Sequence, residues 1–259
     1  HGTASSRLEV LLLKQLADLA RVQLIGVDRP GYGLSSYNPR KALQDFNSDL
    51  NALADHLGLE QFSVLGWSGG GAFALAYFAF NPDRVRRAVL VSAPALPFDV
   101  STAHNLPAAR YIMKTPYVGY FAMRQLSRQL LRANGDTAKF LKTRQGKQLL
   151  HGCSCGDLKF FNDAQWMALM YQSMAEAFHQ GDAGVKAVVD EHQIFTKLWN
   201  LPFSQLDGRT LWIWHGKQDL TCRVSNAYAI AKAVPTANLE IFEGSGHCVL
   251  FERIDKLGK

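Results

Sequence analysis

The sequence lacks long hydrophobic runs: none in its 259 residues approaches the roughly 18 consecutive apolar residues that a membrane-spanning helix needs. Cysteine is scarce too, and Cys153, Cys155, Cys222 and Cys248 show no disulfide framework. A chain of this length can bury a full core without such staples. We therefore predict a protein of a reducing compartment, the cytoplasm. Because the sequence starts with His1 rather than methionine, a lost signal peptide is left open.

Candidate metal ligands are also few. His151, Cys153 and Cys155 stand close together in the sequence, but no second pair of ligands lies near them. We therefore expect neither a metal ion nor an organic cofactor.

The formal net charge of +6 is distributed unevenly, because basic residues concentrate between positions 107 and 159. Within that segment Arg124, Arg128 and Arg132 fall at positions i, i+4 and i+8, which form one stripe on a helix. We interpret the stripe as a solvated helix face. Attraction to an anionic membrane surface or to acidic substrates is the alternative. No nucleic-acid-binding module accompanies the charge, so nucleic acid is not expected as a partner.

A strand, a sharp turn and a helix meet at one serine. The apolar run Phe62–Leu65 has the composition of a buried strand, and the longer run Ala72–Phe80 has that of a buried helix. Between them Ser68 has glycine two residues to each side, which is the pattern of a nucleophile elbow. Such a turn points the helix N-terminus at the serine, so that the amide of Gly69 can donate to a developing oxyanion. A glycine-rich turn without a catalytic role is the alternative.

Strands and helices alternate along most of the chain. We predict strands at Val22–Val27, Phe62–Leu65, Ala88–Ser92, Thr210–His215 and Leu239–Phe242, and further helices at Arg7–Ala20, Arg40–Leu57 and Arg223–Val234. Near-continuous apolar strands separated by helices are typical of an α/β fold with a mostly parallel, doubly wound sheet covered on both faces. The alternation stops between residues 95 and 205, where the clearest element is a helix at Asp163–Gln180. We therefore predict a core formed by 1–94 and 206–259, interrupted by a helical cap at 95–205.

Two further polar residues follow predicted strands. Asp219 comes after the strand that ends at His215, and His247 comes after the strand that ends at Phe242. In a parallel sheet both loops lie at the carboxyl ends of the strands, beside Ser68. A serine hydroxyl needs a base and an acid that orients it, and the chain order Ser, Asp, His is the one expected after a nucleophile elbow. Each residue alone could instead be a helix cap or a surface histidine.

These motifs, taken together, resemble the α/β-hydrolase fold family: His1–Ser6, Asp28–Gly33, Gly66–Gly70, Gly216 with Asp219, and Gly246 with His247. The resemblance implies that Ser68 is the nucleophile, His247 the base and Asp219 the acid. It also implies an oxyanion hole made by the backbone amides of Thr3 and Gly69. The family usually has proline where Ala4 stands. It also places strands before the His-Gly loop, so we expect that N-terminal strands are missing here.

Serine at the elbow predicts acyl transfer to water, in a serine hydrolase that cleaves carboxylic esters of small or medium apolar substrates. The substrate-pocket candidates are Trp67 and three residues of the predicted cap, Trp166, Met170 and Tyr171. An amide or carbon–carbon bond hydrolase is the alternative, because a triad does not reveal the leaving group. A ligand-binding receptor of the same fold with low turnover is another. The oligomeric state is not predicted.

Overall fold

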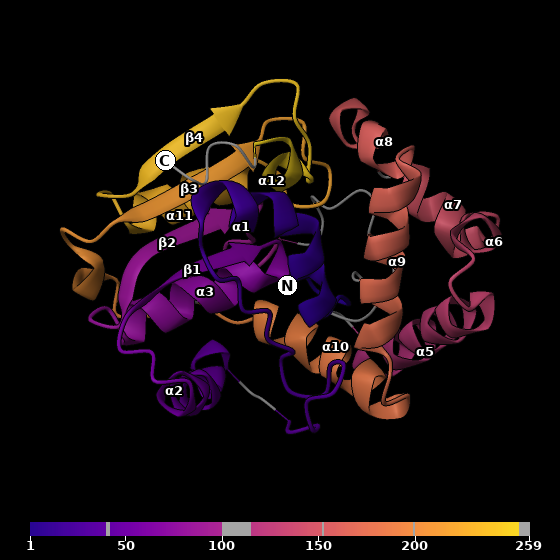
Figure 1. Ribbon diagram of the computed structural model, residues 1–259, viewed down its shortest axis with the longest axis horizontal. Coiled ribbons are helices and arrows are strands. Elements are labelled where there is room, and N and C mark those ends of the chain that lie inside the picture. Colours follow the sequence, from indigo (N-terminus) through magenta and orange to yellow (C-terminus); the bar gives the residue numbers. More distant parts are fainter. Residues whose placement is uncertain (40–41, 100–114, 152, 199, 254–259) are drawn as a thin grey trace.

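The computed structural model describes residues 1–39, 42–99, 115–151, 153–198 and 200–253 (Figure 1). Its strands are β1 (Phe62–Trp67), β2 (Val85–Val91), β3 (Leu211–Gly216) and β4 (Asn238–Phe242). The helices around them are η1 (Arg7–Leu13), α1 (Lys14–Ala20), η2 (Leu43–Phe46), α2 (Asn47–His56), α3 (Gly69–Phe80), α11 (Ser225–Ala233) and α12 (Val249–Glu252), where η marks a 3-10 helix. Between β2 and β3 lie α5 (Pro116–Ala133), α6 (Thr137–Leu141), α7 (Arg144–His151), α8 (Cys155–Phe161), α9 (Ala164–Ala177), α10 (Asp182–Phe195) and η4 (Phe203–Leu206).

The sheet has the order β1-β2-β3-β4, and all three pairs of neighbouring strands are parallel. The four strands confirm the predictions made from the apolar runs between Phe62 and Phe242, within a few residues at their ends. Because parallel strands share one direction, the loops after β1, β3 and β4 emerge at the same edge of the sheet. Those loops carry Ser68, Asp219 and His247.

The predicted strand at Val22–Val27 is wrong. The segment has no strand assignment, and the side chains of Val22 and Ile25 are largely exposed. A strand exists only where a neighbour takes up its N–H and C=O groups. β1 is the first strand of the sheet order, and no strand among the described residues pairs on its outer side. The apolar composition of Val22–Val27 is therefore not sufficient to form a strand here.

Helices cover both faces of the sheet, as predicted. On one face, α3 and α11 bury residues such as Phe78 and Ile230 against Leu90 and Ile213 of the sheet. On the other face, η1 and α12 bury Leu13 and Val249 with Trp67, Val91 and Trp214. Successive strand residues point to opposite faces, and β2 and β3 are apolar on both. α3 is the central helix, with the side chains from Leu75 to Ala79 completely buried.

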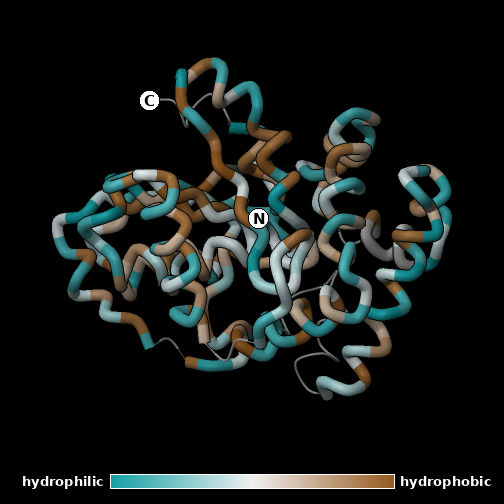
Figure 2. Tube along the Cα trace, turned by 60° about the horizontal axis from the view of Figure 1, so that its bottom comes forward, coloured by the Kyte–Doolittle hydropathy of each residue, from teal (hydrophilic) through white to brown (hydrophobic). Residues whose placement is uncertain are grey.

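The segment between β2 and β3 is helical, as predicted, and its described residues form no strand. The boundaries of the cap at 95 and 205 stay a prediction. Figure 1 shows α5 to α9 grouped together beside the edge of the sheet where β1 ends. In Figure 2 these outlying helices alternate between hydrophilic and hydrophobic residues, which is the pattern of amphipathic helices that pack on one face.

The basic stripe lies on α5. Arg124 forms an ion pair with Asp182, with Nε 3.3 Å from Oδ1, and Arg128 and Arg132 are exposed. The first turns of the same helix expose Tyr117 and Phe121. None of the helices among the described residues combines the length and the apolar character that crossing a bilayer requires.

Candidate active site

Ser68 occupies the turn between β1 and α3 with backbone angles φ 54° and ψ −130°. A positive φ is strained for a residue with a side chain, and such strain is characteristic of a nucleophile elbow. The turn also needs glycine at position 66, because a Cβ there would collide with the backbone of Gly70 and Gly71. The Ser68 amide donates to the carbonyl of Val91 on β2 (2.9 Å), which ties the elbow to the sheet.

Ser68, His247 and Asp219 form one continuous chain of hydrogen bonds. The Ser68 hydroxyl lies 2.9 Å from Nε2 of His247, and Nδ1 of His247 lies 2.8 Å from Oδ2 of Asp219. A carboxylate only accepts, so Nδ1 carries the proton and Nε2 is free to accept one from the serine. Ser68 is half-buried and the His247 side chain is 13% exposed, so neither side chain is completely shielded from solvent. The structure thus brings together the three residues that the sequence singled out.

The charges of Asp219 and His247 act on each other: the pKa of His247 is raised and the pKa of Asp219 is lowered, as a catalytic base requires. Burial alone would lower the pKa of His247, but the charge and hydrogen bond of Asp219 raise it, with help from Asp157 and Glu9. Burial alone would raise the pKa of Asp219, but His247 and a hydrogen bond from His215 bring it below its usual value. Asp219 therefore stays ionised and favours the imidazolium that forms when His247 takes a proton.

Asp219 is held rigidly below His247. Its Oδ1 accepts from the amides of Thr221 (2.8 Å) and Cys222 (2.9 Å), and its Oδ2 lies 3.4 Å from Nε2 of the buried His215. With only 1% of its surface exposed, Asp219 cannot rotate away from His247 without losing these bonds. Asp219 begins a turn before α11, but its side chain is committed to this site rather than acting only as a cap.

The loop that carries Thr3 lies beside Ser68, but the oxyanion hole formed by the amides of Thr3 and Gly69 stays a prediction. A Cβ at Gly2 would lie 3.5 Å from Cβ of Ser68, and a Cβ at Gly69 would collide with the Thr3 hydroxyl, so the loop around Thr3 and the start of α3 are in close contact. Ala4 has φ 57°, a value that the ring of proline cannot adopt. The loop therefore follows a path that the proline usual in the family would not allow.

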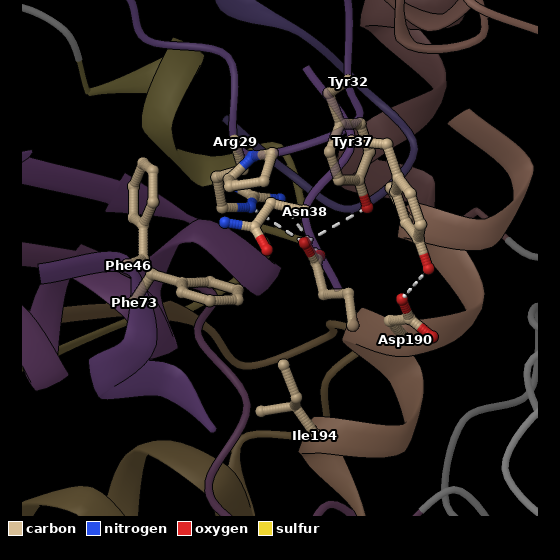
Figure 3. Close-up of a pocket in the computed structure, with 11 residues that line it drawn as sticks. Arg29, Tyr32, Tyr37, Asn38, Phe46, Phe73, Asp190 and Ile194 are labelled. Atoms are coloured by element: carbon tan, nitrogen blue, oxygen red, sulfur yellow. Dashed lines mark hydrogen bonds and ion pairs between the residues drawn. The ribbon is translucent and has the colours of Figure 1, made fainter. Parts of the chain in front are cut away.

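A buried ion pair that no motif in the sequence marks lies behind this loop. Arg29 is 4% exposed and Glu191, on α10, is 3% exposed. Two bonds join them, Nε to Oε2 at 2.8 Å and Nη2 to Oε1 at 3.0 Å. Glu191 also accepts from the hydroxyls of Tyr32 (3.1 Å) and Thr3 (2.5 Å). Arg29, Tyr32 and Glu191 line a cavity of about 20 Å³, which has room for one water molecule, and Figure 3 shows Arg29 and Tyr32 there with Phe73.

Arg29 extends the network to the loop that carries Thr3. Its guanidinium donates to the carbonyls of His1 (2.6 Å) and Gly2 (3.2 Å). Burial alone would lower the pKa of Arg29, but the charge of Glu191 keeps it raised, so the guanidinium stays charged. The pair therefore joins helix α10 to the residues immediately before Thr3. No sequence signal identifies Glu191 as the partner, because 162 positions separate it from Arg29.

The four substrate-pocket candidates lie in different surroundings. Trp67 is 7% exposed, and its indole N–H donates to the carbonyl of His247 (2.9 Å), so it supports the histidine loop. Met170 and Trp166 pack in the same cluster as Trp67. Tyr171 lies in the separate helical cluster, where its hydroxyl donates to the carbonyl of Leu130. Contact of any of them with a substrate stays a prediction.

Of the three candidate metal ligands, the structure describes the side chains of Cys153 and Cys155. Within residues 1–39, 42–99, 115–151, 153–198 and 200–253, no three histidine, cysteine or acidic side chains converge as a metal site would require. The side chain of His151 lies outside the described part of the structure. All four cysteines are free thiols, with Cys155 exposed and Cys222 and Cys248 buried.

A parallel sheet with a serine elbow at the end of a strand defines the class of fold, and comparison with known proteins agrees. The chain belongs to the alpha/beta hydrolase fold family, whose model matches residues 1–254. It is 25% identical to the proline iminopeptidase of Xylella fastidiosa over 255 residues, which cover 91% of this chain and 78% of that protein. It is also 25% identical to the human monoacylglycerol lipase ABHD6 over 250 residues, covering 92% of this chain and 66% of the lipase.

Solved structures show the same fold. Bromoperoxidase from Bacillus anthracis and a thermophilic esterase from Thermogutta terrifontis each align over the whole of this chain with a TM-score of 0.67 and 18% identity. The alignments cover 87% and 84% of those chains. The relatives thus include a peptidase, a lipase and an esterase. They support hydrolase activity, but they differ in the type of bond that they cleave.

Proposed function

We propose that this protein is a serine hydrolase that cleaves carboxylic esters of small or medium apolar substrates. The observation that carries the proposal is the unbroken chain from the Ser68 hydroxyl through His247 to Asp219, with bonds of 2.9 and 2.8 Å. In the proposed reaction His247 takes the serine proton as Oγ attacks the ester carbonyl, and then gives that proton to the departing alkoxide. Water, activated by the same histidine, then hydrolyses the acyl-enzyme and frees Ser68.

The negative charge that forms on the carbonyl oxygen needs hydrogen-bond donors. We assign this role to the backbone amides of Thr3 and Gly69, because the Thr3 loop and the first residue of α3 meet beside Ser68. The N-terminus of α3 adds its partial positive charge at the same place. Removal of one such donor costs about 10²–10³ in turnover in other serine hydrolases.

The polar groups of the helical segment favour an ester over a peptide. An aminopeptidase has to neutralise the free amine of its substrate, which calls for an unpaired carboxylate near the serine. Among the described residues of this segment, the buried carboxylates beside the site, Glu191 and Asp157, are both already bonded to the protein. Outside the segment, Glu9 of η1 accepts from the Gly2 amide through Oε2, and its buried Oε1 has no hydrogen-bond partner in the described part of the chain. Met170 and Trp166 offer apolar surface on the same side as Trp67. We further propose a small apolar molecule as the partner and the cytoplasm as the compartment, which suits four free thiols.

The amide alternative has two specific observations in its favour, the unpaired Oε1 of Glu9 and the 25% identity to a proline iminopeptidase. Hydrolysis of p-nitrophenyl esters of graded chain length, a monoacylglycerol and a proline p-nitroanilide measures both activities on the same preparation. We expect the esters to have the higher kcat/KM. Faster cleavage of the anilide would replace the ester proposal with the peptidase one.

The role of Ser68 is tested separately. A fluorophosphonate is expected to label Ser68 in the wild type and to abolish ester turnover, and Ser68→Ala is expected to lower kcat by about 10⁴-fold or more. A wild type that neither reacts with the fluorophosphonate nor hydrolyses any ester would refute the proposal. Tight ligand binding in such a preparation, unchanged by Ser68→Ala, would favour the low-turnover receptor.

A further inference from the structure

The main chain of His247 is held on both sides by groups outside the triad. Its carbonyl accepts from the indole of Trp67 (2.9 Å), as described above. Its amide donates to Oδ2 of Asp157 (3.1 Å), a residue of α8 in the helical segment. The next amide, of Cys248, donates to Oδ1 of the same carboxylate (2.7 Å). Asp157 thus binds two successive residues immediately before α12, one with each carboxylate oxygen.

Asp157 is built into this position. It is 3% exposed, and Ser154 donates its hydroxyl to Oδ2 of Asp157 (2.7 Å) at the N-terminus of α8. The contact between α8 and the histidine loop is so close that glycine is needed on both sides. A Cβ at Gly246 would collide with Ser154 and Asp157, and a Cβ at Gly156 would lie 3.0 Å from the amide of Gly246 and 3.1 Å from Cα of Ser245.

A buried carboxylate that also binds the backbone amides of His247 and Cys248 makes more contacts than a helix cap needs. The cap of α8 uses only Oδ2 of Asp157, which accepts from the Ser154 amide (3.3 Å) while the Ser154 hydroxyl accepts from the Asp157 amide (3.3 Å). We propose that Asp157 is a positioning residue for the reaction: the helical segment supplies the carboxylate that fixes the main chain of His247 and orients its imidazole between Ser68 and Asp219. The inference rests on the proposed function, because it assigns a role at the same site.

The charge of Asp157 acts on His247 together with its neighbours. The groups that face the imidazole are Asp219 from the loop after β3, Asp157 from α8 and Glu9 from η1, and each raises the pKa of His247. Cys248 follows on the same loop, and burial raises the pKa of its thiol, which therefore stays neutral. Glu252 of α12 accepts from the Ser245 hydroxyl (2.6 Å) and pairs with Lys159 (3.4 Å). Removing the charge of Asp157 should therefore lower the pKa of His247.

The test compares Asp157→Asn with Asp163→Asn. Asp163 is the matched control because it also caps a helix of the same segment, α9, by accepting from the Trp166 amide (2.9 Å). In Asp157→Asn, kcat/KM for an ester is expected to fall by about 10–10²-fold, since a displaced base misaligns the attack. The acid limb of the pH profile is expected to move to lower pH. Asp163→Asn should leave both unchanged.

A second readout does not depend on turnover. Titration of the His247 ring protons by NMR, assigned with a His247→Asn variant, should give a lower pKa in Asp157→Asn than in the wild type and in Asp163→Asn. Asp157→Glu keeps the charge and should retain the position of the acid limb, which separates the charge from loss of packing at α8. This variant also serves if Asp157→Asn does not fold.

The two proposals fail in different ways. A wild type that hydrolyses esters, together with an Asp157→Asn variant whose pH profile and His247 titration match the wild type, overturns the positioning role and leaves the hydrolase intact. Equal shifts in Asp163→Asn would overturn it as well, since they would reflect general loosening of the segment. A wild type without ester turnover or fluorophosphonate labelling refutes the proposed function, and the NMR titration then still decides whether Asp157 sets the pKa of His247.

Discussion

Neutralising one partner of the buried Arg29–Glu191 pair should destabilise the whole protein. Glu191→Gln keeps the shape of the side chain and an acceptor for Tyr32 and Thr3, but it leaves the guanidinium charged in a site where Arg29 is 4% exposed. Breaking a buried pair from one side costs about 3–5 kcal/mol in other proteins. For a chain of this size that corresponds to a fall in Tm of roughly 6–20 °C.

The double variant Arg29→Met with Glu191→Gln separates the cost of an unpaired buried charge from the cost of the altered side chains. Each single variant leaves one unpaired buried charge, whereas the double variant leaves none, so its loss should be clearly smaller than the sum of the single losses. Asp182→Ala is the matched control, because Arg124 and Asp182 also form an ion pair in the helical segment but have side chains 37% and 56% exposed. That change should cost at most about 1 kcal/mol.

Urea unfolding followed by circular dichroism at pH 7, at low and high salt, measures these differences. The loss in Glu191→Gln should persist at high salt, since buried charges are screened little. The kcat of Glu191→Gln should also fall, because Thr3 loses a charged partner. The reasoning is refuted if Glu191→Gln stays within about 1 kcal/mol of the wild type, or if the two single losses simply add.

Three further predictions concern the elbow, a buried histidine and the thiols. Gly66→Ala should prevent native folding or abolish activity, because the new Cβ would collide with the Gly70 backbone. Gly58→Ala, at φ 66° with open space around it, should lower the free energy of unfolding by only about 1–2 kcal/mol. Thermal melts compare the two variants. Burial lowers the pKa of His192, so the folded state resists protonation of this side chain and loses stability as the pH falls through about 6.5. In His192→Gln, the decrease in the free energy of unfolding between pH 7.5 and 5.5, measured by urea unfolding, should therefore be smaller than in the wild type. A thiol reagent should label Cys155 most quickly in the native protein, and Cys155→Ser should remove that fast signal. Fast labelling of Cys222 or Cys248 would contradict their burial.

Local patterns in the sequence predict most of the sheet. β1 and α3 follow from one apolar run on each side of a glycine-rich turn, and β3 and β4 follow from short apolar runs before loops. The prediction fails at Val22–Val27, because whether an apolar segment pairs depends on a neighbour and not on its own residues. The first half of the predicted helix Arg7–Ala20 is a 3-10 helix, a distinction that helical spacing does not resolve.

The site is predictable only in part, for a related reason. Ser68, Asp219 and His247 are recognisable because each stands after a strand, and parallel strands bring such loops together. Asp157 and Glu191 lie on helices, and no motif or position after a strand identifies them as site residues. Each looks like an ordinary acidic residue on an amphipathic helix, and their partners lie 90 and 162 positions away in the sequence. Only the packing of the helices against the sheet reveals what they bind.

The buried carboxylates of Glu191 and Asp157 limit how the helical segment could be exchanged in an engineered chimera. Glu191 on α10 braces the loop that carries Thr3, and Asp157 on α8 holds the loop that carries His247. A chimera that exchanged the helices between β2 and β3 for those of a relative would therefore change more than the shape of the binding site. Unless the donor brought acidic side chains to both docking points, grafting would leave Arg29 without its counter-charge and the amides of His247 and Cys248 without their acceptor.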